Sequence, residues 1–106
     1  MAQQMPPQEL KTKLDRHEPL VMIDVRDPWE VQICRLENSL HIPMEEVPFR
    51  LDELNPEDEY VVICHQGVRS AAISDWMERQ GFLRVSNLDG GLNAWARTID
   101  PSMRRY

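Results

Sequence analysis

The sequence predicts an α/β fold in which helices cover both faces of one central, mostly parallel β-sheet, a three-layer sandwich. Apolar runs of strand length alternate with segments of helical pattern along the whole chain, and this alternation is typical of βαβ units. The strand runs are continuously apolar, which favours strands buried on both faces. A chain of 106 residues with no internal repeat or linker predicts a single domain over residues 1–106, with a core of about 5–97 and a tail of 98–106.

The N-terminal part predicts a helix, a strand and a second helix. Pro7–Arg16 opens with a proline suited to a first helical turn and has two leucines four residues apart, which indicates a short amphipathic helix. Leu20–Val25 is a nearly continuous apolar run and predicts a buried strand. Asp27 then suits an N-cap, Pro28 the first helical position and Glu30 the end of a capping box, so a short helix is expected to begin here.

The middle of the chain predicts two strands around an interrupted helix. Ser39–Pro43 is a short strand that its proline stops. Met44–Leu54 has apolar residues at helical spacing, and Pro48 is expected to confine the regular helix to the second half of this segment. The acidic turn Asn55–Glu59 leads into Tyr60–Ile63, whose apolar, mostly β-branched residues predict the central strand.

The C-terminal part predicts a helix over Arg69–Gln80, a strand over Arg84–Leu88 and a final helix over Leu92–Arg97. Thr98–Tyr106 is interpreted as a tail, docked or frayed. In the helix predicted over Arg69–Gln80, one face is expected to pack into the core; its residues are Ala72, Ile73, Trp76 and Met77.

A cysteine stands where the central strand would pass into the next helix. The loop that follows Cys64 contains Gly67 and Arg69. A tight loop at a helix N-terminus points backbone N–H groups inward and forms an anion cradle that would stabilise a thiolate. Gly67 lets the backbone turn without a Cβ, and the guanidinium of Arg69 offers a planar, charged fork to an anionic substrate. The alternative is a small buried hydrophobic residue at Cys64, but the glycine, the arginine and the helix together favour a nucleophile.

Two charged residues, Asp24 and Arg26, flank Val25 at the end of its predicted strand. In an open parallel sheet this edge faces the ligand crevice. Because buried charges usually occur in pairs, we interpret the two as a structural ion pair or hydrogen-bond clamp that supports the site, rather than as substrate ligands.

Composition and charge narrow the classes of function. A net charge of −6 argues against a general nucleic-acid binder. No apolar run has the length of a membrane span, and the N-terminus lacks the apolar core of a signal peptide. Two cysteines without a CxxC pair, and three scattered histidines, predict neither a disulfide framework nor a metal site. The expectation is a cytoplasmic protein with at least one free thiol, no metal and no cofactor.

Four segments of the sequence carry short motifs that occur together in a known family. Cys64–Ser70, with its Cys-x-x-Gly-x-Arg-Ser pattern, resembles the active-site loop of the rhodanese family of thiosulfate sulfurtransferases. Ile23–Glu30 resembles the early Asp-Val-Arg segment, His41–Pro43 the Asn-Ile-Pro segment, and Leu88–Trp95 the Gly-Gly-x-x-Ala-Trp ending. The segments stand in the family's order and spacing, and the resemblance covers residues 5–97.

The resemblance implies a single-domain sulfurtransferase with Cys64 as the nucleophile. Its thiolate would take the outer sulfur of thiosulfate or a persulfide donor, become a persulfide, and pass the sulfur to a thiophilic acceptor such as a thiol or a sulfur-carrier protein. Backbone N–H groups of residues 65–69 would stabilise the persulfide, and Arg69 would attract the small anionic donor. His65 either helps in this attraction or only forms a wall of the loop. The implied substrate-binding residues are His65, Gln66, Gly67, Val68, Arg69 and Ser70, with Asp24 and Arg26 in support.

The sequence departs from the family pattern at two places. Cys34–Asn38 stands where family members usually have Gly-His-Ile before a Pro-Gly turn, and Cys34 is interpreted as a partly buried thiol in preference to a resolving cysteine. Ile99–Ser102 resembles the tail of rhodanese domains fused behind activating enzymes for ubiquitin-like proteins, which hints at a sulfur-carrier partner.

Three other functions stay open at this point. Cysteine phosphatases use a similar cradle with five residues between cysteine and arginine, whereas four separate Cys64 from Arg69 here, which suits a smaller group than phosphoryl. An arsenate reductase on the same fold would need a thiol cycle, for which Cys34 is the candidate second thiol. A non-catalytic module for binding or redox sensing is the third, although retention of the loop residues favours activity.

Overall fold

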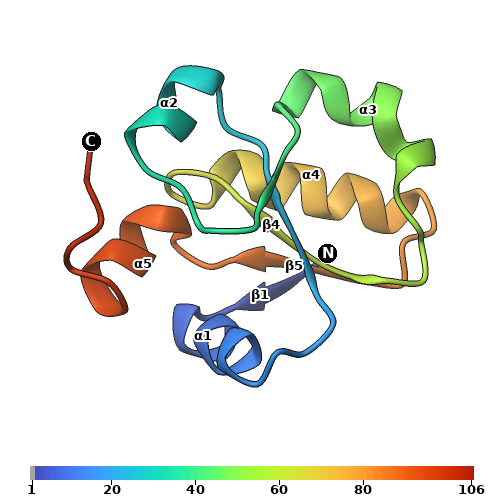
Figure 1. Cartoon of the computed structure of the whole chain (residues 1–106). Coiled ribbons are helices and arrows are strands. Elements are labelled where there is room, and N and C mark those ends of the chain that lie inside the picture. Colours follow the sequence, from blue (N-terminus) through green and yellow to red (C-terminus); the bar gives the residue numbers. More distant parts are fainter. Residues whose placement is uncertain (1) are drawn as a thin grey trace.

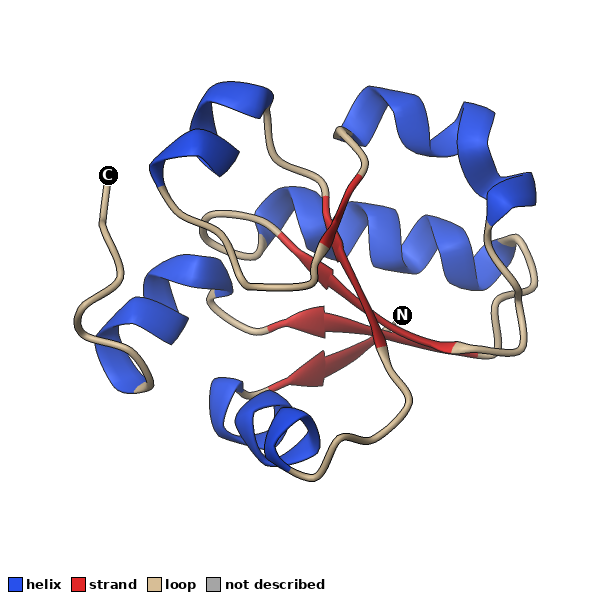
Figure 2. Cartoon of the chain, viewed as in Figure 1, coloured by secondary structure: helices blue, strands red, loops and turns tan. Residues whose placement is uncertain are grey.

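The structure, a computed structural model that describes residues 2–106, is a sheet covered by helices on both faces (Figures 1 and 2). The strands are β1 (Gln3–Met5), β2 (Val21–Asp24), β3 (Leu40–His41), β4 (Glu59–Ile63) and β5 (Arg84–Leu88). They pair in the order β1-β5-β4-β2-β3, and every pairing is parallel. The helices are α1 (Pro7–Asp15), α2 (Pro28–Ile33), α3 (Val47–Arg50), α4 (Val68–Arg79) and α5 (Gly91–Thr98), and the 3₁₀ turns Met44–Glu46 and Leu51–Glu53 flank α3. The predicted fold class is confirmed.

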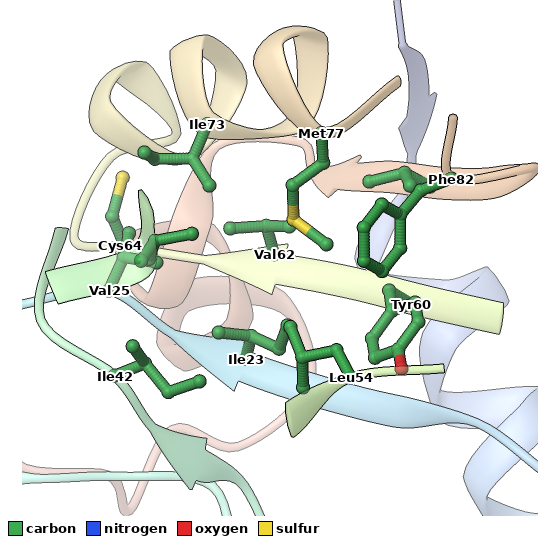
Figure 3. Packing of buried hydrophobic residues seen from close by; sticks show 12 residues of the cluster. Ile23, Val25, Ile42, Leu54, Tyr60, Val62, Cys64, Ile73, Met77 and Phe82 are labelled. Carbon is green, nitrogen blue, oxygen red and sulfur yellow. The ribbon is translucent and has the colours of Figure 1, made fainter. Parts of the chain in front are cut away.

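The central strand β4 separates the core into two halves. Tyr60, Val62 and Cys64 belong to the apolar cluster formed with α3 and α4 (Figure 3). Val61 and Ile63 belong to the opposite cluster, formed with α1 and α5. Because successive side chains of a strand point to opposite faces, a strand buried on both faces must be apolar throughout. Cys64 continues this alternation and therefore enters the core on the α4 side.

The strand β1 was not predicted. The residues Gln3–Met5 have no strand pattern of their own, but they pair with β5, with Gln3 opposite Ser86 and Met5 opposite Leu88. Met5 is buried in the cluster under α1 and α5. Pairing with an available sheet edge, rather than local propensity, makes this segment a strand.

The helix near Pro48 differs from the expectation. The α-helix α3 begins at Val47, has Pro48 in its first turn and ends at Arg50, where a 3₁₀ turn replaces it. The expectation that Pro48 confines the helix to the second half of Met44–Leu54 is therefore wrong. A proline in a first turn lacks only an N–H that has no helical acceptor there.

The buried face of α4 also differs in part from the predicted stripe. Ile73 and Met77 are buried as expected, but Ala72 is exposed. The buried face instead contains two serines, Ser70 and Ser74. Ser74 donates its hydroxyl to the carbonyl of Ser70 at 2.7 Å, so its polar group is satisfied inside the core. The spacing of apolar residues cannot predict buried serines, because a serine enters the core only where its hydroxyl finds a hydrogen-bond partner.

Candidate active site

The parallel sheet brings the carboxyl ends of β2, β4 and β5 to one edge. Cys64 directly follows β4, and Val25, which follows β2, donates its N–H to the carbonyl of Ile63 at 3.0 Å. The loop between β4 and α4 lies between α2 and α5 (Figure 1). In open α/β sheets this edge is where ligands bind.

The sulfur of Cys64 accepts hydrogen bonds from two residues of this loop. The N–H of Gly67 lies 3.1 Å from Sγ, and Ser70 contributes its N–H at 3.4 Å and its hydroxyl at 3.1 Å. Gly67 has a φ of 91° at the N-cap of α4, in the left-handed region that favours glycine. Cys64 is only 1% exposed, so these donors surround the sulfur in place of water. Of the N–H groups of residues 65–69 that were expected to form the cradle, that of Gly67 is hydrogen-bonded to Sγ, and Ser70 supplies the other two donors.

The first turn of α5 holds the same loop from the other side. The N–H of Leu92 donates to the carbonyl of Cys64, and that of Asn93 to the carbonyl of His65, both at 2.9 Å. A Cβ at Gly91 would lie 2.5 Å from each of these two carbonyl oxygens, closer than real contacts allow. The Gly-Gly pair therefore permits close approach of α5 to the loop, in addition to making the turn.

Arg69 is paired with Glu30 of α2. Nη1 and Nη2 of Arg69 donate to Oε2 and Oε1 of Glu30 at 2.7 and 2.8 Å. Glu30 is buried, and it also accepts the N–H of Asp27 at 2.9 Å. The Arg69 hydrogen bonds lower the pKa of Glu30 from 4.5 to about 2, and the same bonds raise the pKa of Arg69. The fork that the sequence analysis assigned to an anionic substrate is thus occupied by a carboxylate in this structure. The sequence predicted Glu30 only as part of a helix cap.

Asp24 and Arg26 form a buried ion pair, as the sequence interpretation favoured. Nη2 of Arg26 lies 2.7 Å from Oδ2 of Asp24, and it also donates to the carbonyl of Cys34 at 2.6 Å. Although burial alone would lower it, hydrogen bonds to Asp24 and Tyr106 raise the pKa of Arg26. Arg26 therefore remains charged and ties the end of β2 to the end of α2.

The last residue, Tyr106, contacts the site, which the sequence analysis did not predict. Its hydroxyl donates to Oε1 of Glu30 at 2.8 Å and accepts from Nη1 of Arg26 at 3.0 Å. Its ring stacks on His65, with centroids 4.0 Å apart and planes at 16°. Burial and the bond to Glu30 raise the pKa of Tyr106 to about 12, so the phenol remains a donor near neutral pH. The C-terminal tail is therefore docked against the site through Tyr106. Its sequence has no periodic pattern that would predict this position.

The other predicted residues are distributed around the loop. Gln66 and Val68 are exposed, whereas His65 is half-buried under the tail. Cys34 is a partly buried free thiol whose Sγ lies 3.8 Å from Nη1 of Arg26, and it lines a small pocket together with His65.

Two kinds of site lack candidate residues in the described part of the chain. Among residues 2–106, no group of three or more His, Cys, Asp or Glu side chains is placed to hold a metal ion. No helix within the same residues has both the length and the apolar character needed to cross a bilayer.

Comparison with known proteins agrees with this arrangement. A family model described as the rhodanese-like domain matches residues 6–98. The chain is 37% identical over 92 residues to the putative sulfurtransferase YtwF of Bacillus subtilis (strain 168), covering 87% of this chain and 88% of that protein. It is 40% identical over 85 residues to the putative sulfur carrier protein YrkF of the same organism, covering 80% of this chain but 46% of that protein.

A solved structure shows the same fold. The rhodanese-like domain protein from Staphylococcus aureus superposes with a TM-score of 0.84 at 31% identity, over 98% of both chains. The names of the two relatives support a role in sulfur transfer. The match of the family model over most of the chain, together with the fold, shows that this protein belongs to the rhodanese-like domain family.

Proposed function

We propose that this protein is a sulfurtransferase that carries a sulfane sulfur from thiosulfate or a persulfide donor to a thiophilic acceptor through a persulfide on Cys64. The observation that carries the proposal is the environment of the Cys64 sulfur: Sγ lies at the start of α4 and has three hydrogen-bond donors within 3.4 Å. Such donors favour an anion at this position. The family membership supports the same chemistry.

The proposed cycle has two displacement steps. In the first, the Cys64 thiolate forms an S–S bond to the outer sulfur of thiosulfate while the S–S bond of thiosulfate breaks, and sulfite leaves with the bonding electron pair. In the second, the thiolate of the acceptor attacks the outer sulfur of the Cys64 persulfide, and the Cys64 thiolate leaves. The sulfane sulfur moves without a further oxidant or reductant, so no cofactor is required.

The loop has two roles in this proposal. Gly67 and Ser70 stabilise negative charge on Sγ before the first step and after the second. His65, Gln66, Val68 and Arg69 form the surface that the donor meets. The side chain of Arg69 is 33% exposed although it is paired with Glu30, so it fixes the loop to α2 while part of the guanidinium stays accessible to an anionic donor. Asp24 and Arg26 support this edge from β2.

The test is the intact mass of the protein after incubation with thiosulfate, followed by cyanide. We expect a gain of about 32 Da, one sulfur atom, that cyanide removes, because the cycle stores the sulfur covalently on the enzyme. Cys64→Ser should show no gain. Cys34→Ser is the matched control, since it removes the other thiol, and it should retain most of the adduct. Loss of the adduct in a folded Cys34→Ser variant would contradict the assignment of Cys34 as a bystander.

Other outcomes of this test distinguish the alternative functions. Absence of the adduct while Cys64 is still alkylated readily near neutral pH would indicate an activated thiolate with another substrate, to be tested with an aryl phosphate and with arsenate. Absence of both would favour a non-catalytic binding or redox-sensing module.

For the acceptor, we propose a small-molecule thiol or a thiol of a sulfur-carrier protein. The similarity to a relative named as a putative sulfur carrier protein supports the second. Incubation of the persulfide form with candidate thiols should return the protein to its unmodified mass.

A further inference from the structure

We infer that Asn87 is a positioning residue for the reaction of Cys64, because it holds both loop residues whose donors contact the sulfur. The inference rests on the proposed function in taking Cys64 as the reacting group. It goes beyond that function by adding a residue of β5, outside every motif that the sequence analysis singled out.

The contacts of Asn87 converge on the cradle. Asn87 is 3% exposed in β5. Its Nδ2 donates to the carbonyl of Gly67 at 3.1 Å, and its Oδ1 accepts the hydroxyl of Ser70. Gly67 and Ser70 are the residues that donate to Sγ of Cys64. A single buried amide thus fixes both sources of the hydrogen bonds on the sulfur.

The orientation of this amide is itself determined by its surroundings. Nδ2 also donates to Oε1 of Gln4, in β1, at 2.9 Å. Both neighbours of Nδ2 are carbonyl-type acceptors, whereas the neighbour of Oδ1 is a hydroxyl that can donate. An inverted amide would place the carbonyl oxygen of Asn87 against two other oxygens. The position of Asn87 between Gln4, Gly67 and Ser70 therefore selects one orientation.

The proton of Ser70 shows how the arrangement serves the reaction. Ser70 has one hydroxyl proton and two acceptors within reach, Sγ of Cys64 at 3.1 Å and Oδ1 of Asn87. When Cys64 is a thiol, its S–H donates to Ser70 and the hydroxyl donates to Asn87. When Cys64 is a thiolate, the hydroxyl proton turns to the sulfur. The hydrogen bond from Ser70 to Asn87 is then released, and Asn87 acts on the thiolate through Gly67, whose carbonyl it continues to hold.

Loss of Asn87 should therefore weaken the stabilisation of the thiolate. The carbonyl of Gly67 would lose its partner in both states of Cys64, and the hydroxyl of Ser70 would lose its partner in the thiol state, so both residues would sample positions farther from the sulfur. A hydrogen bond to the charged form of a group favours that form, so ionisation of Cys64 should require a higher pH.

The test measures the rate of Cys64 alkylation by iodoacetamide as a function of pH, in a Cys34→Ser background where Cys64 is the only thiol. Asn87→Leu removes the three side-chain hydrogen bonds of Asn87, to Gln4, Gly67 and Ser70, at similar volume. We expect the midpoint of the profile to rise by about one pH unit, which lowers the rate about tenfold below both midpoints. At high pH, where Cys64 is ionised in both proteins, the rates should converge.

Two comparisons separate positioning from loss of stability. Ser39→Ala removes another buried hydroxyl, which lies outside the active-site loop and donates to the carbonyl of Leu36 at a distance of 2.7 Å. This variant should lower the melting temperature without moving the pH profile of alkylation. Because Asn87 acts in part through Ser70, the combined fold-change of Asn87→Leu with Ser70→Ala should be smaller than the product of the two single changes.

The inference would be overturned if the pH profile of alkylation for Asn87→Leu superimposed on that of the Cys34→Ser protein. It would also be overturned if the fold-change of the double variant equalled the product of the fold-changes of Asn87→Leu and Ser70→Ala. If circular dichroism shows Asn87→Leu to be unfolded, Asn87→Ser takes its place, and an unmoved profile there overturns the inference equally. Iodoacetamide needs no sulfur donor. A displaced profile in a protein that forms no persulfide would therefore refute the proposed function and leave the role of Asn87 standing.

Discussion

At the scale of single residues, Glu30 joins a helix cap to the active-site loop. The carboxylate accepts the N–H of Asp27 at the start of α2 and both guanidinium nitrogens of Arg69. Its buried charge is thus met by hydrogen bonds on both oxygens, which is the condition under which a buried ion pair is tolerated. Removing one partner would leave the other charge uncompensated.

Replacing Glu30 by glutamine should lower the free energy of unfolding near neutral pH by about 3 kcal/mol, since the fold shifts the pKa of Glu30 from 4.5 to about 2. Because this pKa is lowered in the folded protein, the contribution is complete above 4.5 and is lost as the pH falls towards 2. The stabilities of the wild type and Glu30→Gln should therefore converge in this window, as measured by urea unfolding at successive pH values.

Glu53→Gln is the matched control for this prediction. Glu53 pairs with Arg50 at 3.1 Å, but its side chain is 54% exposed. We expect a change below about 1 kcal/mol, as is usual for surface ion pairs. A stability difference for Glu30→Gln that stays constant down to the lowest pH would contradict the assignment.

At the scale of elements, the loop after β4 takes its shape from α5 as much as from its own residues. The carbonyls of Cys64 and His65 accept the N–H groups of Leu92 and Asn93, which are free at a helix N-terminus. The two segments meet only because Gly91 has no Cβ. The active-site loop and the Gly-Gly motif are therefore one structural unit.

Gly91→Ala should displace this loop. The new Cβ would lie 2.5 Å from two backbone oxygens at a φ of +61°, so either the loop or α5 must move. We expect persulfide formation from thiosulfate to fall at least about tenfold, because a misplacement of about 1 Å can cost a hundredfold in rate. The adduct yield over time, followed by mass spectrometry, measures the effect.

Gly81→Ala provides the comparison for backbone strain alone. Gly81 also has a positive φ, +97°, but nothing lies within 4 Å of its added Cβ. This variant should lose about 1 kcal/mol of stability and retain its rate of persulfide formation. Equal losses of rate in the two variants would show that strain, rather than displacement of the loop, is responsible.

At the scale of the whole molecule, the C-terminal segment returns to the edge of the sheet that carries Cys64. In Figure 1 it leaves α5 and runs towards α2. Tyr106 stacks on His65 and reaches Arg26 and Glu30 with its hydroxyl. The segment thereby connects α5, the active-site loop and α2 in one network.

Tyr106→Phe should loosen this segment while keeping the ring on His65. The variant loses two hydrogen bonds to charged groups, each worth about 1.5–3 kcal/mol. We expect trypsin to cleave faster after Arg104 and Arg105, which are exposed, with mass spectrometry as the measurement.

Tyr60→Phe serves as the control for Tyr106→Phe. It removes a tyrosyl hydrogen bond to the carbonyl of Asn55 at 3.0 Å, at the other end of β4, and should leave tail cleavage unchanged. Equal cleavage of the Tyr106→Phe variant and the wild type would show that the hydroxyl does not hold the tail.

Local sequence patterns are sufficient to predict the features that depend on neighbours a few residues apart. The alternation of buried strands and helices, the cysteine at the end of β4 and Gly67 at the start of α4 all follow from local patterns. The donors of the cradle belong to the same group, since one stretch of chain supplies them, although α5 and Asn87 hold that stretch in place.

The side-chain partners that meet across the sheet edge are set by the three-dimensional packing of the strands and helices. Glu30 pairs with Arg69 across 39 positions, Asn87 reaches Gly67 across 20, and Tyr106 reaches Glu30 across 76. The strand β1 likewise exists because β5 offers it an edge. Contacts of this kind depend on which strands are adjacent and leave no periodic signal in the chain, because each partner is a single side chain in an otherwise ordinary position.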